Sequence, residues 1–527
     1  MTHEVFNQPP PLVDYNLFSS DRALREAVAR EGGGWACGQL EEFGRRLGTA
    51  EVMEWAALAN DYPPVLHTHD RYGRRLDQVQ FHPAWHNLMR LAVEHGIHNL
   101  PWAHPRSGAH VARAALAILA MENEAGHVCP ISMTFSAVPV LRQDPTLAKE
   151  WEPRVHSTCY DSSFRPAPEK SGELLGMAMT EKQGGSDVRA NTTRAEPIGN
   201  GEYRITGHKW FCSAPMNDAF LVLAQAPGGL TCFFLPRWTP DGQRNGFHLQ
   251  RLKSKLGNRS NASSEVEFDG AWARRVGEEG RGVPTIIEMV QHTRLDCTLG
   301  SAALMRRALV EAVHHCTYRY AFGKPLIEHA LMQNVLADLA VESEAATLLA
   351  MRVARAFDEN DSTFARLAVA VAKYWTCKRS PAHIAEALEC LGGSGYVEEC
   401  PMPRLYREAP LNGIWEGSGN VIVLDALRTI QKDPESLELV MAEIRSARDP
   451  RIEKFAVTPP VAEADGRRFV ERLAIALQAS LLMRFSPPAV ADAFGASRLD
   501  GGGGRAFGTL PPGVAMKQVI ASVGLNR

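Results

Sequence analysis

Apolar and polar residues follow three successive patterns along the chain. Helical spacing dominates residues 20 to about 155, clearest in "GAHVARAALAILAMENEAG", and no stretch before residue 170 alternates as a strand would. Residues 175 to 280 contain short runs rich in aromatic and β-branched residues between turn residues, such as "GEYRITGHKWFCS" and "GLTCFFLPRW". Helical periodicity returns at 282, where Leu295, Leu299, Ala302 and Met305 share one face. This order predicts a mainly helical α+β protein with a small antiparallel β domain.

These changes of pattern divide the chain into four segments. We predict an N-terminal arm and helical domain at 1–174, the antiparallel β domain at 175–281, a helical domain at 282–434 and a C-terminal helical extension at 435–527. With 527 residues, 45% of them apolar, the chain is long enough to bury a sizeable core.

Composition excludes several classes of protein. No window approaches eighteen uninterrupted apolar residues, and "MTHEVFNQPPPLVDYN" lacks the features of a signal peptide, so we expect a cytoplasmic protein that does not enter membranes. The ten cysteines are scattered singly, which is typical of reduced thiols. The net charge of −3 is uneven, because residues 444–527 contain 12 Lys+Arg against 7 Asp+Glu, a local balance of +5.

Two short motifs have an ordinary structural interpretation beside a functional one. The glycines of "LGGSGY" lie between helical segments and not after a strand, which argues against a dinucleotide-binding turn. His82 and His86 in "FHPAWH" have the i,i+4 spacing of a metal pair, but no third ligand accompanies them, so we expect no metal site.

The segment "GMAMTEKQGGSDVRANTTRAE" is more specific. Hydroxyls at Thr180 and Ser186 flank glycines whose backbone amides can approach a phosphate or an electron-rich ring closely. The segment resembles the flavin loop of the acyl-CoA dehydrogenase family, whose T-E-x-x-x-G-S-D pattern it matches. The resemblance implies that FAD is bound here by Met177, Met179, Thr180, Gly185 and Ser186.

Five further motifs of that family follow in order, so the resemblance covers about residues 80 to 430. "GHKWFCS" is similar to the strand that places an aromatic ring, here Phe211, against the flavin and a hydroxyl, here Ser213, near flavin N5. "KLGNRSNASSEVEFDGAW" with "VGEEGRG" resembles the strands that lead into the helical domain. In "YRYAFGKPL" the resemblance implies that Arg319 and Phe322, with Gln333, reach the flavin diphosphate of a neighbouring subunit.

The remaining motifs concern the adenine side of the flavin and the active-site loop. "ALECLGGSGY" resembles a Q-x-x-G-G pattern, with Gly392 and Gly393 in place but Glu389 where many members have glutamine. "IWEGSGN" resembles the loop that carries the catalytic base, which implies that Glu416 is the base. The same loop contributes Trp415, Ser418 and Asn420 to the flavin site.

The resemblance also implies a mechanism and a substrate site. A carboxylate removes the proton α to a thioester carbonyl, and donors aimed at the carbonyl oxygen stabilise the enolate. Trp415 would desolvate Glu416 and raise its pKa toward the range of a general base. Arg294 and Trp415 are the candidate substrate residues, and Thr293 stands where other members carry an alternative glutamate base, so Glu416 has no rival. The fold implied is that of the family, with extra C-terminal helices.

Local sequence favours one branch of the family. "VFNQPPPL", "FHPAWHNLM" and "IWEGSGN" look like the branch that serves the adaptive response to DNA alkylation, which has weak isovaleryl-CoA dehydrogenase activity and a C-terminal domain associated with double-stranded DNA. The basic C-terminal segment suits phosphate contacts, and pairs of basic residues there share helix faces. The candidates for DNA contact are Arg445, Arg448, Arg451, Lys454, Arg468 and Arg472.

Three functions therefore stay open. The first is an FAD-dependent dehydrogenase of a short or branched acyl-CoA, assembled as a homotetramer. The second is a flavin-containing DNA-binding protein in which acyl-CoA turnover is vestigial. The third is an acyl-CoA oxidase, because the sequence does not distinguish a flavoprotein from oxygen as the electron acceptor.

Overall fold

The computed structural model describes residues 2–359, 361–455, 457–459 and 462–525. Its chain forms two compact units, and each unit gathers several separate stretches of sequence. Unit 1 comprises Met1–Met53, Arg106–Asn123 and Arg294–Arg527, and unit 2 comprises Glu54–Pro105 and Glu124–Thr293. The four predicted segments follow the order of the chain, whereas each unit combines parts of several of them.

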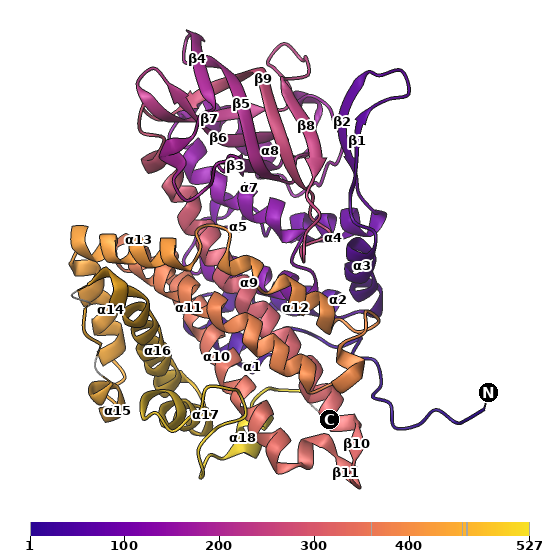
Figure 1. Ribbon diagram of the computed structural model, residues 1–527, viewed down its shortest axis with the longest axis vertical. Coiled ribbons are helices and arrows are strands. Elements are labelled where there is room, and N and C mark those ends of the chain that lie inside the picture. Colours follow the sequence, from indigo (N-terminus) through magenta and orange to yellow (C-terminus); the bar gives the residue numbers. More distant parts are fainter. Residues whose placement is uncertain (1, 360, 456, 460–461, 526–527) are drawn as a thin grey trace. The chain divides into compact units, whose positions relative to one another are not determined.

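Unit 2 is built around a seven-stranded sheet (Figure 1). Its pairings run in a closed circuit from β6 through β4, β5, β9 and β7 back to β6, with β3 and β8 attached at β6 and β9. Most pairings are antiparallel, as predicted, but β3–β6 and the single β4–β6 pair are parallel. The strands are β3 (Leu175–Ala178), β4 (Arg194–Gly199), β5 (Glu202–Ser213), β6 (Ala219–Ala226), β7 (Gly229–Pro236), β8 (Phe247–Leu252) and β9 (Ser263–Val276).

Alternation along the strands gives this sheet two apolar faces. One cluster of buried residues includes Phe220 and Phe247, whose rings stack 5.0 Å apart. On the other face helices cover β6 and β7, and the Trp151 ring meets the Phe234 ring at 4.6 Å. The helices assigned wholly to unit 2 are α4 (Pro83–Glu94), α5 (Leu100–Ala103), α7 (Val128–Leu141) and α8 (Pro145–Val155).

A β-hairpin before residue 170 corrects the prediction that this region contains no strand. β1 (Val65–His69) and β2 (Arg75–Gln80) pair antiparallel. Both faces of β1 carry partly exposed side chains, so its alternation of polar and apolar residues is weak in the sequence. Tertiary contacts hold the hairpin instead: Arg75 donates to the Leu249 carbonyl at 2.9 Å, and the Leu249 N–H donates to Asp77 at 3.0 Å.

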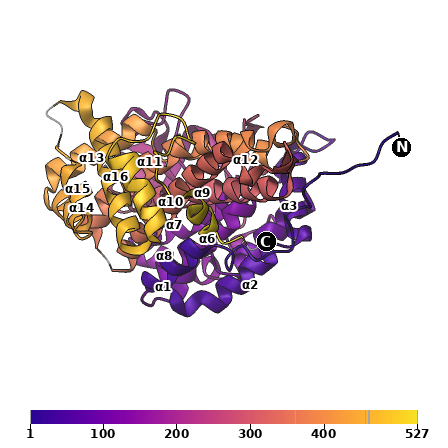
Figure 2. The same cartoon turned by 90° about the horizontal axis from the view of Figure 1, so that it is seen from below.

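Unit 1 is a helical assembly. Long apolar helices form its centre, and α6 is buried along its whole length. Figure 2 shows α16 beside α11 and α13, so the predicted C-terminal extension packs directly on the preceding helices. The helices are α1 (Arg22–Arg30), α2 (Cys37–Leu47), α3 (Ala50–Asp61, shared with unit 2), α6 (Ala109–Asn123), α9 (Gly282–Tyr318, from Arg294 on), α10 (Ala330–Asp358), α11 (Ser362–Glu389), α12 (Met402–Glu408), α13 (Gly419–Lys432), α14 (Glu435–Arg445), α15 (Pro450–Lys454), α16 (Gly466–Phe485), α17 (Pro488–Phe494) and α18 (Met516–Ala521).

Candidate functional site

The predicted flavin loop leaves β3 and is bound to β5 of the same unit. The Trp210 N–H donates to the Thr180 carbonyl at 2.8 Å, which fixes the start of the loop. Gly185 has a steric reason to be glycine, because a Cβ there would lie 2.4 Å from Thr180 Oγ1. Gly184 has a φ of +140°, which also favours glycine, and no atom lies within 4 Å of where its Cβ would be. Gly185 and Ser186 are exposed, so their backbone amides are accessible to a ligand.

A buried ion pair supports this loop from beneath. Lys209 Nζ lies 2.9 Å from Glu181 Oε1, and both side chains are fully buried. Burial alone would raise the pKa of the Glu181 carboxyl, but Lys209 and the hydrogen bonds from Thr192 and Thr193 hold that pKa well below its usual range. Burial also lowers the pKa of Lys209, against the attraction of Glu181. Glu181, the glutamate of the motif, therefore anchors the loop, a role that was not predicted from the sequence.

The neighbouring residues of β5 provide an exposed aromatic ring beside a hydroxyl. Phe211 is 49% exposed although it lies within β5, whose other face is buried in the core, and Ser213 is partly buried. Met177 and Met179 pack against the core beneath the loop. An exposed ring on β5 and exposed glycines in a loop that is hydrogen-bonded to β5 fit a planar cofactor with a phosphate tail, so this set of residues suits FAD.

In unit 1 the Glu416 loop joins the short turn Leu411–Gly413 to α13. Glu416 has a φ of +58° and Gly417 a φ of +107°, so two successive residues have left-handed backbone. For a glutamate this costs about 1–2 kcal/mol, and such conformations concentrate at functional sites. The side chain of Glu416 is half-buried.

Arg294 fastens this loop to two neighbouring helices. Its Nε donates to the Glu416 carbonyl oxygen at 3.0 Å, and its Nη1 lies 2.6 Å from Asp425 of α13. Arg366 of α11 binds the same carboxylate at 2.6 Å. Burial would raise the pKa of Asp425, but the two guanidinium groups lower it. The predicted substrate residue Arg294 is thus placed where it holds the backbone of the predicted base.

Lys373 supports the other side of the loop. It is 1% exposed in the middle of α11, and its Nζ donates to the carbonyl oxygens of Asn412 at 3.1 Å and Gly417 at 2.8 Å. Trp415 is half-buried and donates from Nε1 to Asn412 Oδ1 at 3.1 Å. Lys373 was not predicted from the sequence, where the one signal for it is a lone lysine inside the apolar run "ARLAVAVAKYW".

The other predicted flavin residues of unit 1 lie on its surface. Phe322 is 97% exposed, at the tip of the hairpin formed by β10 (Tyr320–Ala321) and β11 (Lys324–Pro325). Gln333 donates to the Ile327 carbonyl at 3.0 Å, which ties α10 to the end of that segment. The remaining residues at this surface are exposed: Glu389, Gly392, Gly393, Ser418 and Asn420.

The six basic candidates of the C-terminal extension differ in their contacts. Arg451 is engaged by Asp449 at 2.8 Å and by Asp492 at 3.1 Å, and Arg472 lies 3.9 Å over the Phe455 ring. Arg445 lies 3.8 Å from Glu438, with both side chains exposed. The other three, Arg448, Lys454 and Arg468, are exposed and have no acidic partner within 4.0 Å in the part of the chain that the structure describes.

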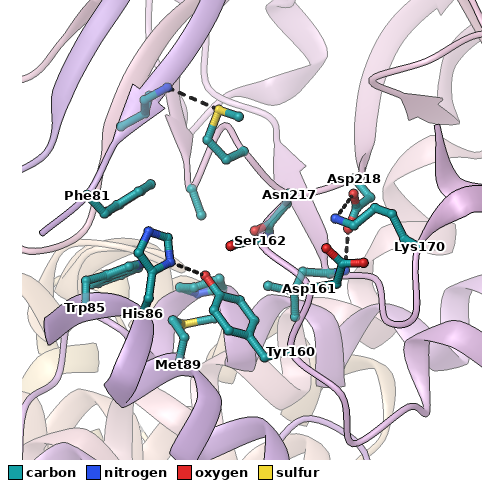
Figure 3. A pocket seen from close by; sticks show the side chains of 15 residues that line it. Phe81, Trp85, His86, Met89, Tyr160, Asp161, Ser162, Lys170, Asn217 and Asp218 are labelled. Carbon is teal, nitrogen blue, oxygen red and sulfur yellow. Dashed lines mark hydrogen bonds and ion pairs between the residues drawn. The ribbon is translucent and has the colours of Figure 1, made fainter. Parts of the chain in front are cut away.

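Unit 2 also contains a cavity of about 60 Å³ that none of the predicted site residues lines. In Figure 3 His86 points toward Tyr160, and its Nδ1 lies 2.9 Å from the Tyr160 hydroxyl; Lys170 pairs with Asp218 at 2.6 Å. Asp161 accepts from the Ser163 and Ser171 N–H groups at 2.9 and 3.1 Å. The charged lining groups therefore already bind one another or the backbone.

Neither histidine of the "FHPAWH" motif forms part of a metal cluster. His82 accepts from the Ala84 N–H at 3.2 Å and so caps α4, whereas His86 contacts Tyr160. Among the described residues no group of three or more His, Cys, Asp or Glu is arranged to hold a metal ion. None of the described helices is long and apolar enough to cross a membrane.

Family models match most of the chain. A model of the N-terminal domain of the adaptive response protein AidB matches residues 7–162, and models of the acyl-CoA dehydrogenase middle and C-terminal domains match 176–271 and 280–431. Residues of the Glu416 loop and of the flavin loop lie inside the last two matches.

Relatives and solved structures agree with these matches. AidB of Escherichia coli (strain K12) is 48% identical over 517 residues, which are 95% of each chain. Acyl-CoA dehydrogenase family member 11 of Caenorhabditis elegans is 32% identical over 433 residues, 77% of this chain and 69% of that protein. A structure of C. elegans ACDH-11 in complex with C11-CoA superposes with a TM-score of 0.83 and 26% identity, over 95% of this chain and 94% of the other. The chain therefore belongs to the AidB branch of the acyl-CoA dehydrogenase family and has that family's fold.

Proposed function

We propose that this protein is an FAD-dependent dehydrogenase that oxidises the α,β C–C bond of a short or branched acyl-CoA, such as isovaleryl-CoA. The observation that carries the proposal is the Glu416 loop. The backbone that carries the Glu416 carboxylate is strained, and Arg294 and Lys373 bind the carbonyl oxygens of Glu416 and Gly417, so it is positioned more tightly than a surface loop requires. FAD, when bound, accepts the hydride that leaves the β-carbon.

The residues of the chain have separate tasks in this reaction. The Glu416 carboxylate removes the α-proton, and its backbone N–H donates to the thioester carbonyl oxygen, where negative charge develops. Arg294 and Lys373 keep that backbone in place, because both bind carbonyl oxygens of the loop. Trp415 limits water and substrate volume beside the carboxylate. Thr180, Gly185 and Ser186, with Phe211 and Ser213, would hold the flavin.

Anaerobic titration with a panel of acyl-CoAs tests the proposal. We expect isovaleryl-CoA and other short substrates to bleach the flavin, and Glu416→Gln to slow bleaching at least about 1,000-fold while FAD stays bound. A panel that extends to the eleven-carbon acyl-CoA seen with the C. elegans relative separates short-chain from long-chain specificity. A Glu416→Gln variant that bleaches at the wild-type rate would refute the assignment of the base.

We further propose that the protein is a homotetramer. Phe322, Leu331 and Tyr396 are 97%, 84% and 80% exposed in the single chain, and large apolar side chains exposed to this degree suit a contact surface. In the tetramer Arg319 and Phe322 would serve a neighbour's flavin. Native mass measurement of the yellow protein checks this; a flavin-loaded monomer would contradict it.

A second candidate function is DNA binding by the C-terminal extension, and the three uncompensated cations Arg448, Lys454 and Arg468 favour it. Contacts to phosphates make affinity fall as salt rises. We expect the triple alanine variant to weaken duplex binding and to reduce the salt dependence. Arg451→Ala is the matched control, because that guanidinium is already bound by Asp449 and Asp492. Affinity for duplex DNA that does not change with salt would exclude this function.

A further inference from the structure

The N-terminal motif "VFNQPPPL" contacts the segment that carries Arg319. Arg319 Nη1 donates to the Asn7 carbonyl oxygen at 2.6 Å. The Asn7 side chain makes two hydrogen bonds to Tyr320, the residue after Arg319. Its Nδ2 donates to the Tyr320 carbonyl at 2.9 Å, and its Oδ1 accepts from the Tyr320 N–H at 2.8 Å. Asn7 thereby binds the backbone of Tyr320 as a neighbouring β-strand would.

The backbone of Asn7 is adapted to this contact. Its φ of +58° lies in the left-handed region, which asparagine tolerates better than most residues. This conformation turns both the carbonyl and the side chain of one residue toward Arg319 and Tyr320. A three-point contact of this kind needs an asparagine at the position, because aspartate would keep the acceptor and lose the side-chain donor.

The rest of the arm is stiff and is attached at several points. Pro9, Pro10 and Pro11 each fix φ near −65°, so the arm is restricted to an extended conformation. His314 Nε2 lies 2.8 Å from the Pro10 carbonyl oxygen, and the Asp14 N–H donates to Gly48 at 2.7 Å. Figure 1 shows the arm as an extended indigo segment. Asn7 is therefore held by a stiff strap and is not a freely moving end.

The segment that Asn7 binds leads directly into the exposed hairpin tip. Phe322 and Gly323 have φ values of +50° and +81°, which match the two central positions of a type I′ turn. A phenylalanine in this conformation is strained, and the pairing of β10 with β11 is only two residues long. The hairpin has few internal contacts to keep Arg319 and Phe322 in one orientation.

We propose that Asn7 is a positioning residue for the flavin-diphosphate contact: the arm clamps the Arg319–Phe322 segment in the conformation that binds a neighbouring subunit's FAD. One N–H group of Arg319 donates to the Asn7 carbonyl oxygen, and the remaining donors of its guanidinium stay available for a diphosphate. The inference rests on the proposed function, because it assigns Arg319 and Phe322 to FAD. It gives the "VFNQPPPL" motif a task that does not involve the substrate.

The affinity of the full-length protein for FAD tests this proposal. Asn7→Gly is the decisive variant, since glycine keeps the positive φ and the backbone carbonyl but removes both side-chain bonds. We expect FAD to dissociate about fivefold to tenfold more readily from Asn7→Gly, while the Tm of the apoprotein changes little. Asn7→Asp keeps the acceptor and loses the donor, so it should be intermediate.

Gln8→Ala is the matched control, because Gln8 is exposed and neighbours Asn7. It should bind FAD as the wild type does. If Asn7→Gly and Gln8→Ala both retain FAD like the wild type, the clamp is refuted and the proposed function stands. A fall in apoprotein Tm without a change in FAD affinity also refutes it, since Asn7 would then be merely structural. If the wild type itself binds no FAD, the proposed function fails and the clamp with it.

Discussion

The flavin loop of unit 2 and the Glu416 loop of unit 1 are each supported by a buried lysine, but the two lysines are neutralised differently. Lys209 pairs with the Glu181 carboxylate at 2.9 Å. Lys373 donates instead to two backbone carbonyls, and no carboxylate lies within 4.0 Å of its ammonium among the residues that the structure describes. One loop is therefore held by an ion pair, and the other by a cation bound to peptide dipoles.

The difference affects the electrostatics of the Glu416 loop. Burial raises the pKa of the Cys297 thiol well above its usual range, and Lys373 and Glu416 act on that thiol in opposite directions. The Lys373 ammonium lies 2.8 Å from the carbonyl oxygen of Gly417, the residue that follows Glu416. Lys209, in contrast, has its own counter-ion in Glu181. The ion pair adds no net charge beneath the proposed flavin loop, whereas Lys373 adds a positive charge beside the loop of the proposed base, Glu416.

Breaking the ion pair should have the largest effect. Lys209→Met leaves Glu181 buried without its partner, and such a loss costs about 3–5 kcal/mol. We expect this drop in the free energy of unfolding, measured in urea, together with loss of bound FAD. The double variant Lys209→Met/Glu181→Gln also removes the unpaired Glu181 carboxylate, so it should recover part of the stability. A double variant as unstable as the single one would show that charge pairing is not what Lys209 contributes.

Removing the second lysine should cost less stability and more activity. Lys373→Met leaves two carbonyl oxygens without their donor, which costs about 2 kcal/mol. We expect FAD to remain bound while the rate of flavin bleaching by substrate falls at least about tenfold, because the Glu416 backbone loses one support. Lys378→Met is the control, since Lys378 lies on the same helix but is exposed. Equal rates in the two variants would contradict the role of Lys373.

The smallest expected effect is a difference in how the stability contributions of the two lysines depend on pH. The pKa of Glu181 is lowered in the folded protein, so its contribution is fully present above the unfolded value of about 4.3 and is lost as pH falls toward the folded value. The stability difference between the wild type and the Lys209→Met/Glu181→Gln variant should therefore shrink between pH 5 and pH 3. The cost of Lys373→Met should change less over that range, since the groups that accept its hydrogen bonds are carbonyls, which do not titrate. Urea unfolding at both pH values measures the two trends.

The comparison also shows how far the sequence could predict the site. Motif order placed Glu416 and the Thr180–Ser186 loop within segments that match the family models, because those residues carry characteristic types at fixed spacing. Lys209 and Lys373 were not predicted, since a lysine in an apolar run is ordinarily expected to reach solvent. Their partners lie 28 and 44 residues away from them in the sequence, so only the folded chain brings them together.

The order of helices and strands was predictable from the sequence, but the β1–β2 hairpin was not. The helix–strand–helix order was predictable from periodicity, and the long helix α9 begins at Gly282, where the predicted boundary lies. The β1–β2 hairpin was missed because its side chains are partly exposed and its stability comes from Arg75, Asp77 and the strand β8. Arg451 looked available for phosphates, but Asp492, 41 residues further along, engages it.

The strap at Asn7 has a practical consequence for handling the protein. An affinity tag fused ahead of the arm would place a flexible, charged chain within a few residues of the contact to Arg319 and Tyr320. Preparations tagged at that end are expected to emerge paler than untagged ones, with the yellow colour returning after the tag is cleaved. Colour loss during purification would then report on the position of the tag and not on the quality of the enzyme.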